Sequence, residues 1–292
     1  MIIIPQRLFS DPQVQVILRD GNVCILQKKL TEPIREREGY ISNHVISLLL
    51  AGEQHLRTFD DETIRVQAGE ILFIPRGLYY ISDLLPEAGA FGSLLFYFDD
   101  RIIQEFLSVS RVDEFNRDRI PTHLKCKAPP AISLFARSLL GIYQQNGIRQ
   151  KQFLDLKILE LLHLLNGQVP SRQFADFLFR LTLPKKRNIR HFMQQNFDKP
   201  LKIEDYAYLT GRSPSSFRRD FKQFFATTPQ KWIKQKRLEK ARSLLEEQSS
   251  SVADLAFAVG YENVSYFIKE FKDAFGISPK QLQLSQEEKK EK

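Results

Sequence analysis

The sequence has little cysteine, and the two residues present, Cys24 and Cys126, lie far apart. That spacing fits neither a disulfide framework nor a zinc site, so we interpret both as reduced thiols. No stretch reaches the about eighteen consecutive apolar residues of a membrane span. The start, MIIIPQRLFSDP, lacks the charged and apolar regions of a secretory signal. We therefore expect a cytoplasmic protein without membrane contact.

Histidines are few, and no His-x-His pair occurs. A metal-dependent enzyme built on a small β-barrel needs histidines and a carboxylate that meet at one ion, for which His44, His55 and Glu53 are the candidates. No nucleophile elbow, P-loop or dinucleotide fingerprint is present. The sequence therefore predicts no catalytic site, metal or cofactor, and a metal-dependent enzyme with an accessory DNA-binding domain is the less favoured alternative. The five histidines are His44, His55, His123, His163 and His191.

The excess positive charge lies in one part of the chain. The formal net charge is +8; residues 1–183 carry 21 Lys and Arg against 21 Asp and Glu, whereas residues 184–292 carry 22 against 14. A uniformly basic chain fits a membrane or a nucleic acid equally well. Segregation of the charge favours a polyanion as the partner of the C-terminal part.

A helical motif occurs twice in that basic part. Residues 201–225 read LKIEDYAYLTGRSPSSFRRDFKQFF, and residues 251–275 read SVADLAFAVGYENVSYFIKEFKDAF. Gly211 aligns with Gly260 and Phe221 with Phe271, with one residue added in the second turn. Repeats separated by a linker predict two similar structural units, which we name the first head (201–225) and the second head (251–275).

Local chemistry predicts a helix-turn-helix in each head. In the first, apolar residues recur at helical spacing and end at Gly211, where a left-handed residue terminates a helix. Ser213 and Pro214 then form a good start for a second helix. Small Ala207 and Ala256 allow the two helices of each head to pack closely. Phe217, Phe221 and Phe224 are predicted as the buried stripe of the second helix, and Phe267, Phe271 and either Ala274 or Phe275 as its counterpart.

The other face of each second helix is polar and cationic. Arginine in a major groove reads guanine edges bidentately, while lysine and serine hold phosphate. Ile268 makes no directional hydrogen bond, so we expect the second head to give more phosphate contact and less base discrimination. The predicted DNA-binding residues are Ser215, Ser216, Arg218, Arg219, Lys222, Ser265, Tyr266, Ile268, Lys269 and Lys272.

Residues 184–283 resemble the DNA-binding domain of the AraC/XylS family of bacterial transcription regulators. The resemblance rests on HFMQQNFDKPLKIEDYAYLTGRSPSSFRRDFKQFFATTPQKWIKQKRLEKARSLL and VADLAFAVGYENVSYFIKEFKDAFGISPKQL. It implies that Ser215, Arg218 and Arg219 lie at base-reading positions of the first head. Ser265, Tyr266, Ile268 and Lys269 match the second. Thr227, where the family commonly carries glycine, and Ile268, where a small polar residue is usual, depart from the pattern.

The linker between the heads reads as one helix over Pro229–Glu247. Nineteen residues at about 1.5 Å each span about 28 Å, somewhat less than the about 34 Å repeat of a DNA turn. Two recognition helices at its ends are thus expected to reach successive major grooves, with bending of the duplex.

Residues 1–100 read as short strands separated by turns, which favours a small barrel or sandwich. VQAGEILFIPRGLYYIS resembles the cupin-like sensor barrel that precedes many AraC-type DNA-binding domains. The fold class is therefore α+β, a cupin-like barrel with helices followed by an all-α domain. The predicted strands are Val14–Leu18, Val23–Gln27, Val45–Leu50, Thr63–Val66, Glu70–Ile74, Tyr79–Ser82 and Gly92–Phe98.

Helices follow the barrel. A short one is predicted after residue 100, then Ile132–Gln145 and Phe153–Leu165 around a turn at Asn146-Gly147, and a last one over 171–184. The segment IPTHLKC between them reads as strand or loop. A leucine seam in Phe153–Leu165 fits packing on the barrel or contact with a second subunit, and the AraC-type resemblance favours dimerisation. The seam residues are Leu154, Ile158, Leu161, Leu162 and Leu165.

These expectations divide the chain into four parts: a regulatory barrel (1–128), a helical dimerisation segment (129–183), a DNA-binding domain (184–285) and a charged tail (286–292). EILFIPRGLYYIS and LKILELLHLL resemble ExsA-like activators of type III secretion genes, which implies control by a protein anti-activator. We predict a homodimeric transcriptional activator that binds double-stranded promoter DNA and RNA polymerase. A regulator that responds to a small molecule is the alternative.

Overall fold

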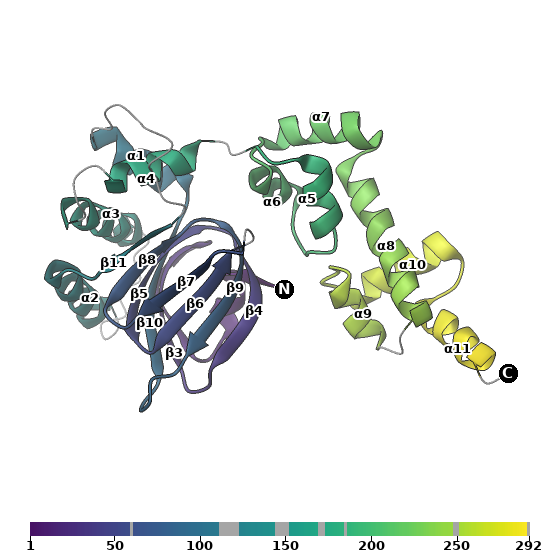
Figure 1. The fold of residues 1–292 in the computed structure, drawn as a ribbon, viewed down its shortest axis with the longest axis horizontal. Helices are drawn as coiled ribbons and strands as arrows, with labels where there is room; N and C mark the ends of the chain where they lie inside the picture. Colours follow the sequence, from purple (N-terminus) through teal and green to yellow (C-terminus); the bar gives the residue numbers. More distant parts are fainter. Residues whose placement is uncertain are drawn as a thin grey trace. The chain divides into compact units, whose positions relative to one another are not determined.

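The chain forms two compact units, Met1–Leu183 (unit 1) and Pro184–Lys292 (unit 2). A computed structural model describes residues 1–58, 61–110, 123–143, 152–168, 173–183, 186–247 and 251–290. Unit 1 holds all the strands and four α-helices, and the described part of unit 2 is helical (Figure 1). The α+β fold expected from the sequence is confirmed.

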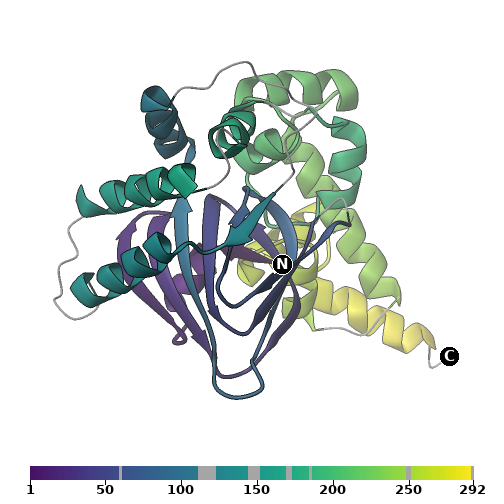
Figure 2. The same cartoon turned by 60° about the vertical axis from the view of Figure 1, so that its left-hand side comes forward.

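Two sheets build the barrel of unit 1, as the views of Figures 1 and 2 show. One has five strands in the order β1-β4-β9-β6-β7, and the other has six in the order β11-β8-β5-β10-β3-β2. The pair β1–β4 is parallel. The sequence predicts seven of the strands, leaves the segment of β11 as strand or loop, and does not predict β1, β4 or β6. The bounds are β1 Ile2–Ile4, β2 Val14–Asp20, β3 Val23–Leu30, β4 Ile34–Ile41, β5 His44–Ala51, β6 Glu53–Thr58, β7 Thr63–Gln67, β8 Glu70–Ile74, β9 Gly77–Leu84, β10 Phe91–Phe98 and β11 Leu124–Lys127.

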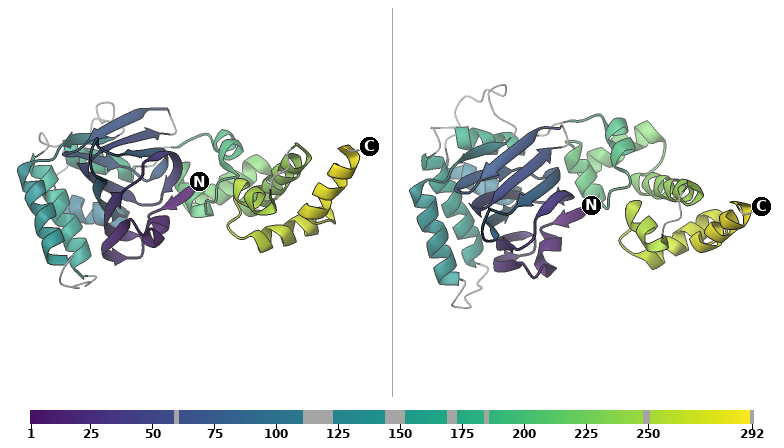
Figure 3. Two further views of the ribbon diagram at one scale, coloured as in Figure 1. Left: turned by 90° about the horizontal axis from the view of Figure 1, so that it is seen from below. Right: turned by 60° about the horizontal axis from the view of Figure 1, so that its bottom comes forward.

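Unit 1 has an apolar core on each face of the six-stranded sheet. Successive side chains of a strand point to opposite faces, so in β3 Leu26 enters the barrel interior while Ile25 packs on the outer face. Helices cover that outer face, and Figure 3 shows two of them, α2 and α3, side by side against it. The helices of unit 1 are η1 Gln6–Ser10, α1 Asp100–Val109, α2 Pro130–Tyr143, α3 Gln152–Gln168 and α4 Gln173–Thr182. The turn expected at residues 146–147 lies outside the described residues.

The leucine seam of α3 belongs to this outer core. All five seam residues are buried within the same chain, none more than 2% exposed, and they pack with residues of α1, α2, α4 and the sheet. Within the single chain these side chains stabilise unit 1. The dimerisation role expected for Leu154, Ile158, Leu161, Leu162 and Leu165 stays a prediction.

Unit 2 arranges two helix pairs along one long helix. The linker helix α8 has the bounds that the sequence predicts. The last helix extends to Lys290, so residues 286–290, assigned from the sequence to a tail, are helical. The helices are α5 Ile189–Asn196, α6 Ile203–Leu209, α7 Pro214–Phe225, α8 Pro229–Glu247, α9 Val252–Ala258, α10 Val264–Phe275 and α11 Pro279–Lys290.

Candidate DNA-binding surface

The turn between the two helices has the same backbone geometry in both heads. Gly211 has φ of +68° and Gly260 has φ of +86°, values that glycine adopts without steric cost. After each glycine a backbone amide returns to the preceding helix: the N–H of Arg212 donates to Ala207 O, and that of Tyr261 to Ala256 O, both at 2.9 Å. The glycine terminators predicted from the repeat are thus confirmed at both positions.

Polar side chains cap the start of both recognition helices. Ser213 Oγ accepts a hydrogen bond from the N–H of Ser216 at 3.2 Å, and Pro214 takes the first helical position. In the second head Asn263 Oδ1 accepts from the N–H of Tyr266 at 2.8 Å. Each cap satisfies one backbone donor that a helix start leaves free. The caps therefore fix the residue at which α7 and α10 begin. The start of each helix in turn determines which of its side chains lie on the same face.

An aromatic stripe anchors each recognition helix. Phe217 and Phe221 are fully buried in α7, but Phe224, predicted to join them, is 40% exposed. Phe225 takes the place on the stripe, because it follows Phe221 by four residues and stacks on it with ring centroids 4.4 Å apart. Trp232 of α8 closes this cluster at 4.7 Å from Phe225. In α10, Phe267, Phe271 and Phe275 form the corresponding stripe.

The opposite face of each recognition helix is exposed and carries the predicted DNA contacts. In α7, the Arg219 side chain is 78% exposed and the Arg218 side chain 47%. In α10, Tyr266 is 55% exposed and Ile268 37%. Ser216 alone among the predicted residues is half-buried, next to its capped helix start. The remaining exposed members are Ser215, Lys222, Ser265, Lys269 and Lys272.

Each recognition helix also carries an acid at the same aligned position, Asp220 in α7 and Glu270 in α10, which a neighbouring base neutralises; α10 has a second, exposed acid, Asp273. In α7, Asp220 accepts a hydrogen bond from Arg212 Nε at 2.9 Å, which holds the pKa of Asp220 below its usual value. The aligned acid in α10, Glu270, pairs with Lys234 of α8 at 2.6 Å, and this contact raises the pKa of Lys234. An unpaired acid would repel phosphate. Helical periodicity in the sequence does not predict either ion pair, because each pair joins residues of different helices or turns.

A further acid contacts the first recognition helix directly. Glu204 of α6 lies 3.2 Å from Arg218 Nη2, with both side chains about half exposed. Such an exposed pair contributes little stability. It positions Arg218, and Arg219 in turn donates to Ser216 Oγ at 3.1 Å. The two arginines predicted to read bases are therefore held by neighbours of their own head.

The histidines of unit 1 take part in separate polar contacts. Buried His44 accepts a hydrogen bond from the N–H of Arg76 on Nδ1 at 3.1 Å, so Nε2 carries the proton and donates to Asp100 at 3.0 Å. This bond lowers the pKa of Asp100. His55 instead lies 2.8 Å from Glu53. Among the residues described, no three His, Cys, Asp or Glu side chains come together as metal ligands, and none of the helices is long and apolar enough to cross a membrane.

Two capped helix pairs with cationic exposed faces define a DNA-binding protein with paired helix-turn-helix units. Residues 206–285 match a family model described as a helix-turn-helix domain, and residues 44–177 match the ExsA N-terminal regulatory domain. With both matches in one chain, the protein belongs to the AraC/XylS family of transcription regulators.

Curated relatives align along most of the chain. The HTH-type transcriptional regulator ExsA of Pseudomonas aeruginosa is 23% identical over 244 residues, covering 83% of this chain and 87% of that protein. The virulence regulon transcriptional activator VirF of Yersinia enterocolitica is 26% identical over 235 residues, covering 77% and 83%. Among solved structures, ToxT of Vibrio cholerae is similar at 12% identity and a TM-score of 0.43, covering 91% of this chain and 99% of that one.

Proposed function

We propose that the protein is a sequence-specific transcriptional activator that a protein partner controls through unit 1. The observation that carries the DNA-binding half is the pair of exposed cationic faces on α7 and α10, where the aligned acids Asp220 and Glu270 are paired with Arg212 and Lys234. Arg218 and Arg219 specify bases, and Lys222, Lys269 and Lys272 hold phosphates. The proposal extends to a cytoplasmic homodimer that recruits RNA polymerase to promoters.

Control by a protein is supported by the interior of the barrel. Lys28 and Asp83 form a buried ion pair there, and Gln54 Nε2 donates to Asp83 at 2.6 Å. Ser47 Oγ donates to Gln54 Oε1 at 3.3 Å. These side chains satisfy one another across strands of both sheets. An anti-activator that binds the outer surface of unit 1 needs no change in this interior.

Dimerisation is assigned to apolar side chains that the helices of unit 1 leave exposed. Leu134 of α2 is 62% exposed and Leu156 of α3 is 60% exposed. We propose these two as contacts with a second copy. Leu134→Glu and Leu156→Glu are expected to shift the chain to monomers in sedimentation experiments, while Arg35→Glu, at an exposed position of β4 in the five-stranded sheet, should leave the oligomeric state unchanged.

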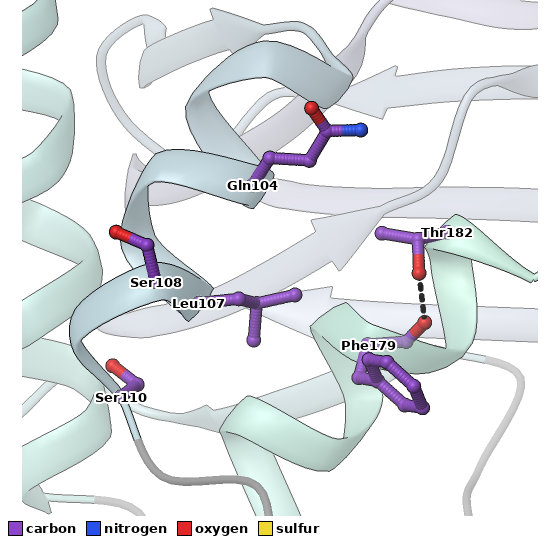
Figure 4. Close-up of a pocket in the computed structure, with 6 residues that line it drawn as sticks. All are labelled: Gln104, Leu107, Ser108, Ser110, Phe179 and Thr182. Carbon is purple, nitrogen blue, oxygen red and sulfur yellow. Dashed lines mark hydrogen bonds between the residues drawn. The ribbon is translucent and has the colours of Figure 1, made fainter.

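The alternative, response to a small molecule, is favoured by one groove between α1 and α4. Its volume is about 470 Å³, within the range of about 300–1,000 Å³ for ligand pockets. Figure 4 shows Leu107 of α1 reaching toward α4, where Thr182 Oγ1 donates to Phe179 O at 2.7 Å. The lining residues are Gln104, Leu107, Ser108, Ser110, Phe179 and Thr182.

The two modes of control differ in a transcription assay with purified RNA polymerase and a promoter bound by the protein. Lysate is separated into a low-molecular-weight fraction and a protein fraction, and each is added to the reaction. We expect the protein fraction to change transcript yield and Leu107→Trp, which fills the groove, to have no effect. Regulation by the small-molecule fraction that is lost in Leu107→Trp would favour the alternative.

The division of labour on the DNA surface has its own test. Arg219→Ala is expected to relax sequence preference, because a base-reading contact is worth about 1–3 kcal/mol of discrimination. Lys272→Ala is expected to weaken cognate and scrambled duplexes alike and to lower the slope of log affinity against log salt by about 1. If both variants weakened cognate and scrambled DNA equally, the assigned roles would be refuted.

A further inference from the structure

One arginine in the middle of α8 contacts both the second head and the loop that leads into the first head. Arg237 Nε donates to Phe197 O at 2.8 Å, and Nη2 donates to Lys199 O in the same loop between α5 and α6. Nη1 donates to Gly260 O of the second head at 2.9 Å. A guanidinium has five donors in a rigid, planar arrangement. Here that arrangement joins backbone carbonyls that lie more than sixty residues apart.

The loop that Arg237 holds is fixed from the other side as well. The buried hydroxyl of Tyr206 donates to Asn196 O at 2.9 Å and lies 3.1 Å from Lys199 O. Lys240, one turn along α8 from Arg237, contacts Asp198 at 2.5 Å. The loop over 196–199 therefore has little freedom to move relative to α6 or α8. A contact made to this loop is a contact made to the first head.

The second head touches that same loop. A Cβ atom placed on Gly260 would lie 2.4 Å from Asp198 O and 3.0 Å from the Arg237 guanidinium carbon. That approach is too close for any residue but glycine. The turn of the second helix-turn-helix thus rests on the backbone that precedes α6, and the ring of Tyr261, the next residue, lies 5.9 Å from the guanidinium.

We infer that Arg237 is a positioning residue that locks the two heads at one separation and angle, so that the spacing between two DNA segments is part of what the protein recognises. This inference rests on the proposed function. Heads joined only through the ends of α8 would pivot and tolerate different spacings. Contact of one guanidinium with the second head and with the loop that leads into the first head removes that freedom.

The test measures tolerance to spacing in the full-length chain. A duplex is selected from a random pool with the wild-type protein, footprinting locates its two half-sites, and two base pairs are inserted between them. The insertion rotates the second half-site by about 70° and moves it by about 7 Å. We expect the wild type to lose affinity about 30-fold, as the second head leaves its bases. Arg237→Met should bind both duplexes within about threefold.

Lys236→Met is the control for the lost charge. Lys236 also lies on α8, but its side chain is 41% exposed and pairs with Glu239 of the same helix. We expect this variant to keep the wild-type ratio between the two duplexes. A wild-type ratio in Arg237→Met would overturn the inference while the DNA-reading function stands. Failure to select any duplex would overturn that function and the inference together.

A second set of variants distinguishes a role of Arg237 in stability alone from its proposed role in setting the spacing of the heads. Trp232 fluorescence reports unfolding of unit 2, and a lower Tm with an unchanged spacing ratio counts against the inference. If Arg237→Met gives no cooperative transition, Arg237→Lys keeps the charge but cannot reach three carbonyls and should still lose spacing discrimination. Gly260→Ala should do the same, whereas Gly276→Ala, also at positive φ but with open space around it, should not.

Discussion

The ion pair inside the barrel allows a quantitative test of how unit 1 is held together. The Lys28 side chain is 8% exposed and that of Asp83 is fully buried. Their strands, β3 and β9, belong to different sheets, so the pair crosses the interior. The Lys28 ammonium also lies 5.7 Å from the ring centroid of Phe91. Removing one partner leaves the other charged in an apolar surrounding.

We expect each single substitution to cost much more than the double one. Lys28→Met leaves a buried carboxylate unpaired, and Asp83→Asn leaves a buried ammonium facing an amide donor. Each is expected to destabilise unit 1 by about 3–5 kcal/mol. The double variant removes both charges, and the new asparagine still accepts the hydrogen bond from Gln54. Its expected cost is about 1–2 kcal/mol, close to the loss of one ordinary hydrogen bond.

The position of the single tryptophan makes this measurable in the intact chain. Trp232 lies in α8 of unit 2, so its fluorescence follows unfolding of unit 2 alone. Far-UV circular dichroism in urea follows both units, and the transition that fluorescence does not report belongs to unit 1. Only that transition should shift in the three variants. A double variant as unstable as the two single costs added together would refute the reasoning, because it would mean that the two charges do not interact.

Two further predictions concern unit 2. Phe225→Ala is expected to cost about 3 kcal/mol of stability and Phe224→Ala less than about 1 kcal/mol, measured by Trp232 fluorescence in urea. Equal costs would contradict the packing of half-buried Phe225 on Phe221 and Trp232. Arg212→Ala is expected to cost about 2–3 kcal/mol, since charged hydrogen bonds are lost. Because the folded pKa of Asp220 is lowered, the Arg212 contribution should be complete above about pH 4 and fall as pH drops through the folded pKa; a pH-independent difference would contradict the pairing.

The strands that the sequence predicts and those it misses differ in what lies on their two faces. Strands of the six-stranded sheet, such as β3 and β5, are buried on both faces between the barrel interior and the helices, so they read as apolar runs. The missed strands β1, β4 and β6 belong to the five-stranded sheet. In β4, Arg35 and Arg37 are exposed, and their charges hide the strand pattern.

The leucine seam shows a different limit of sequence reasoning. Apolar residues at helical spacing predict that one face of α3 is buried, and in the structure that face is buried. The spacing is the same whether a sheet of the same chain or a second subunit covers that face. The resemblance to a family that dimerises favoured the second subunit, whereas within this chain the sheet and the neighbouring helices cover the seam. Helix bounds are predicted correctly where local chemistry sets them. Pro229, for example, sets the start of α8.

At the DNA-binding surface, the sequence could not predict which basic residues make contacts with parts of the chain far away in sequence. Arg212, Lys234 and Arg237 are each one basic residue among many in a basic segment. Their roles come from partners that folding brings near: an acid of α7, an acid of α10, and carbonyls of the second head and of the loop that leads into the first head. The repeat did reveal which face of each recognition helix is exposed, because that depends on periodicity alone.

The two heads therefore combine unequal chemistry with fixed geometry. The first exposes two arginines, Arg218 and Arg219, which we propose to read base edges through hydrogen bonds, whereas the second exposes Tyr266 and Ile268 on a helix whose lysines suit phosphate. If the heads moved independently, a weakly discriminating second head would add affinity at many positions along DNA. When Arg237 locks it to the first head, the second head adds affinity only at a fixed distance along the DNA from the sequence that the first head reads. A rigid connection thus gives a second head with few base-reading groups a share in specificity.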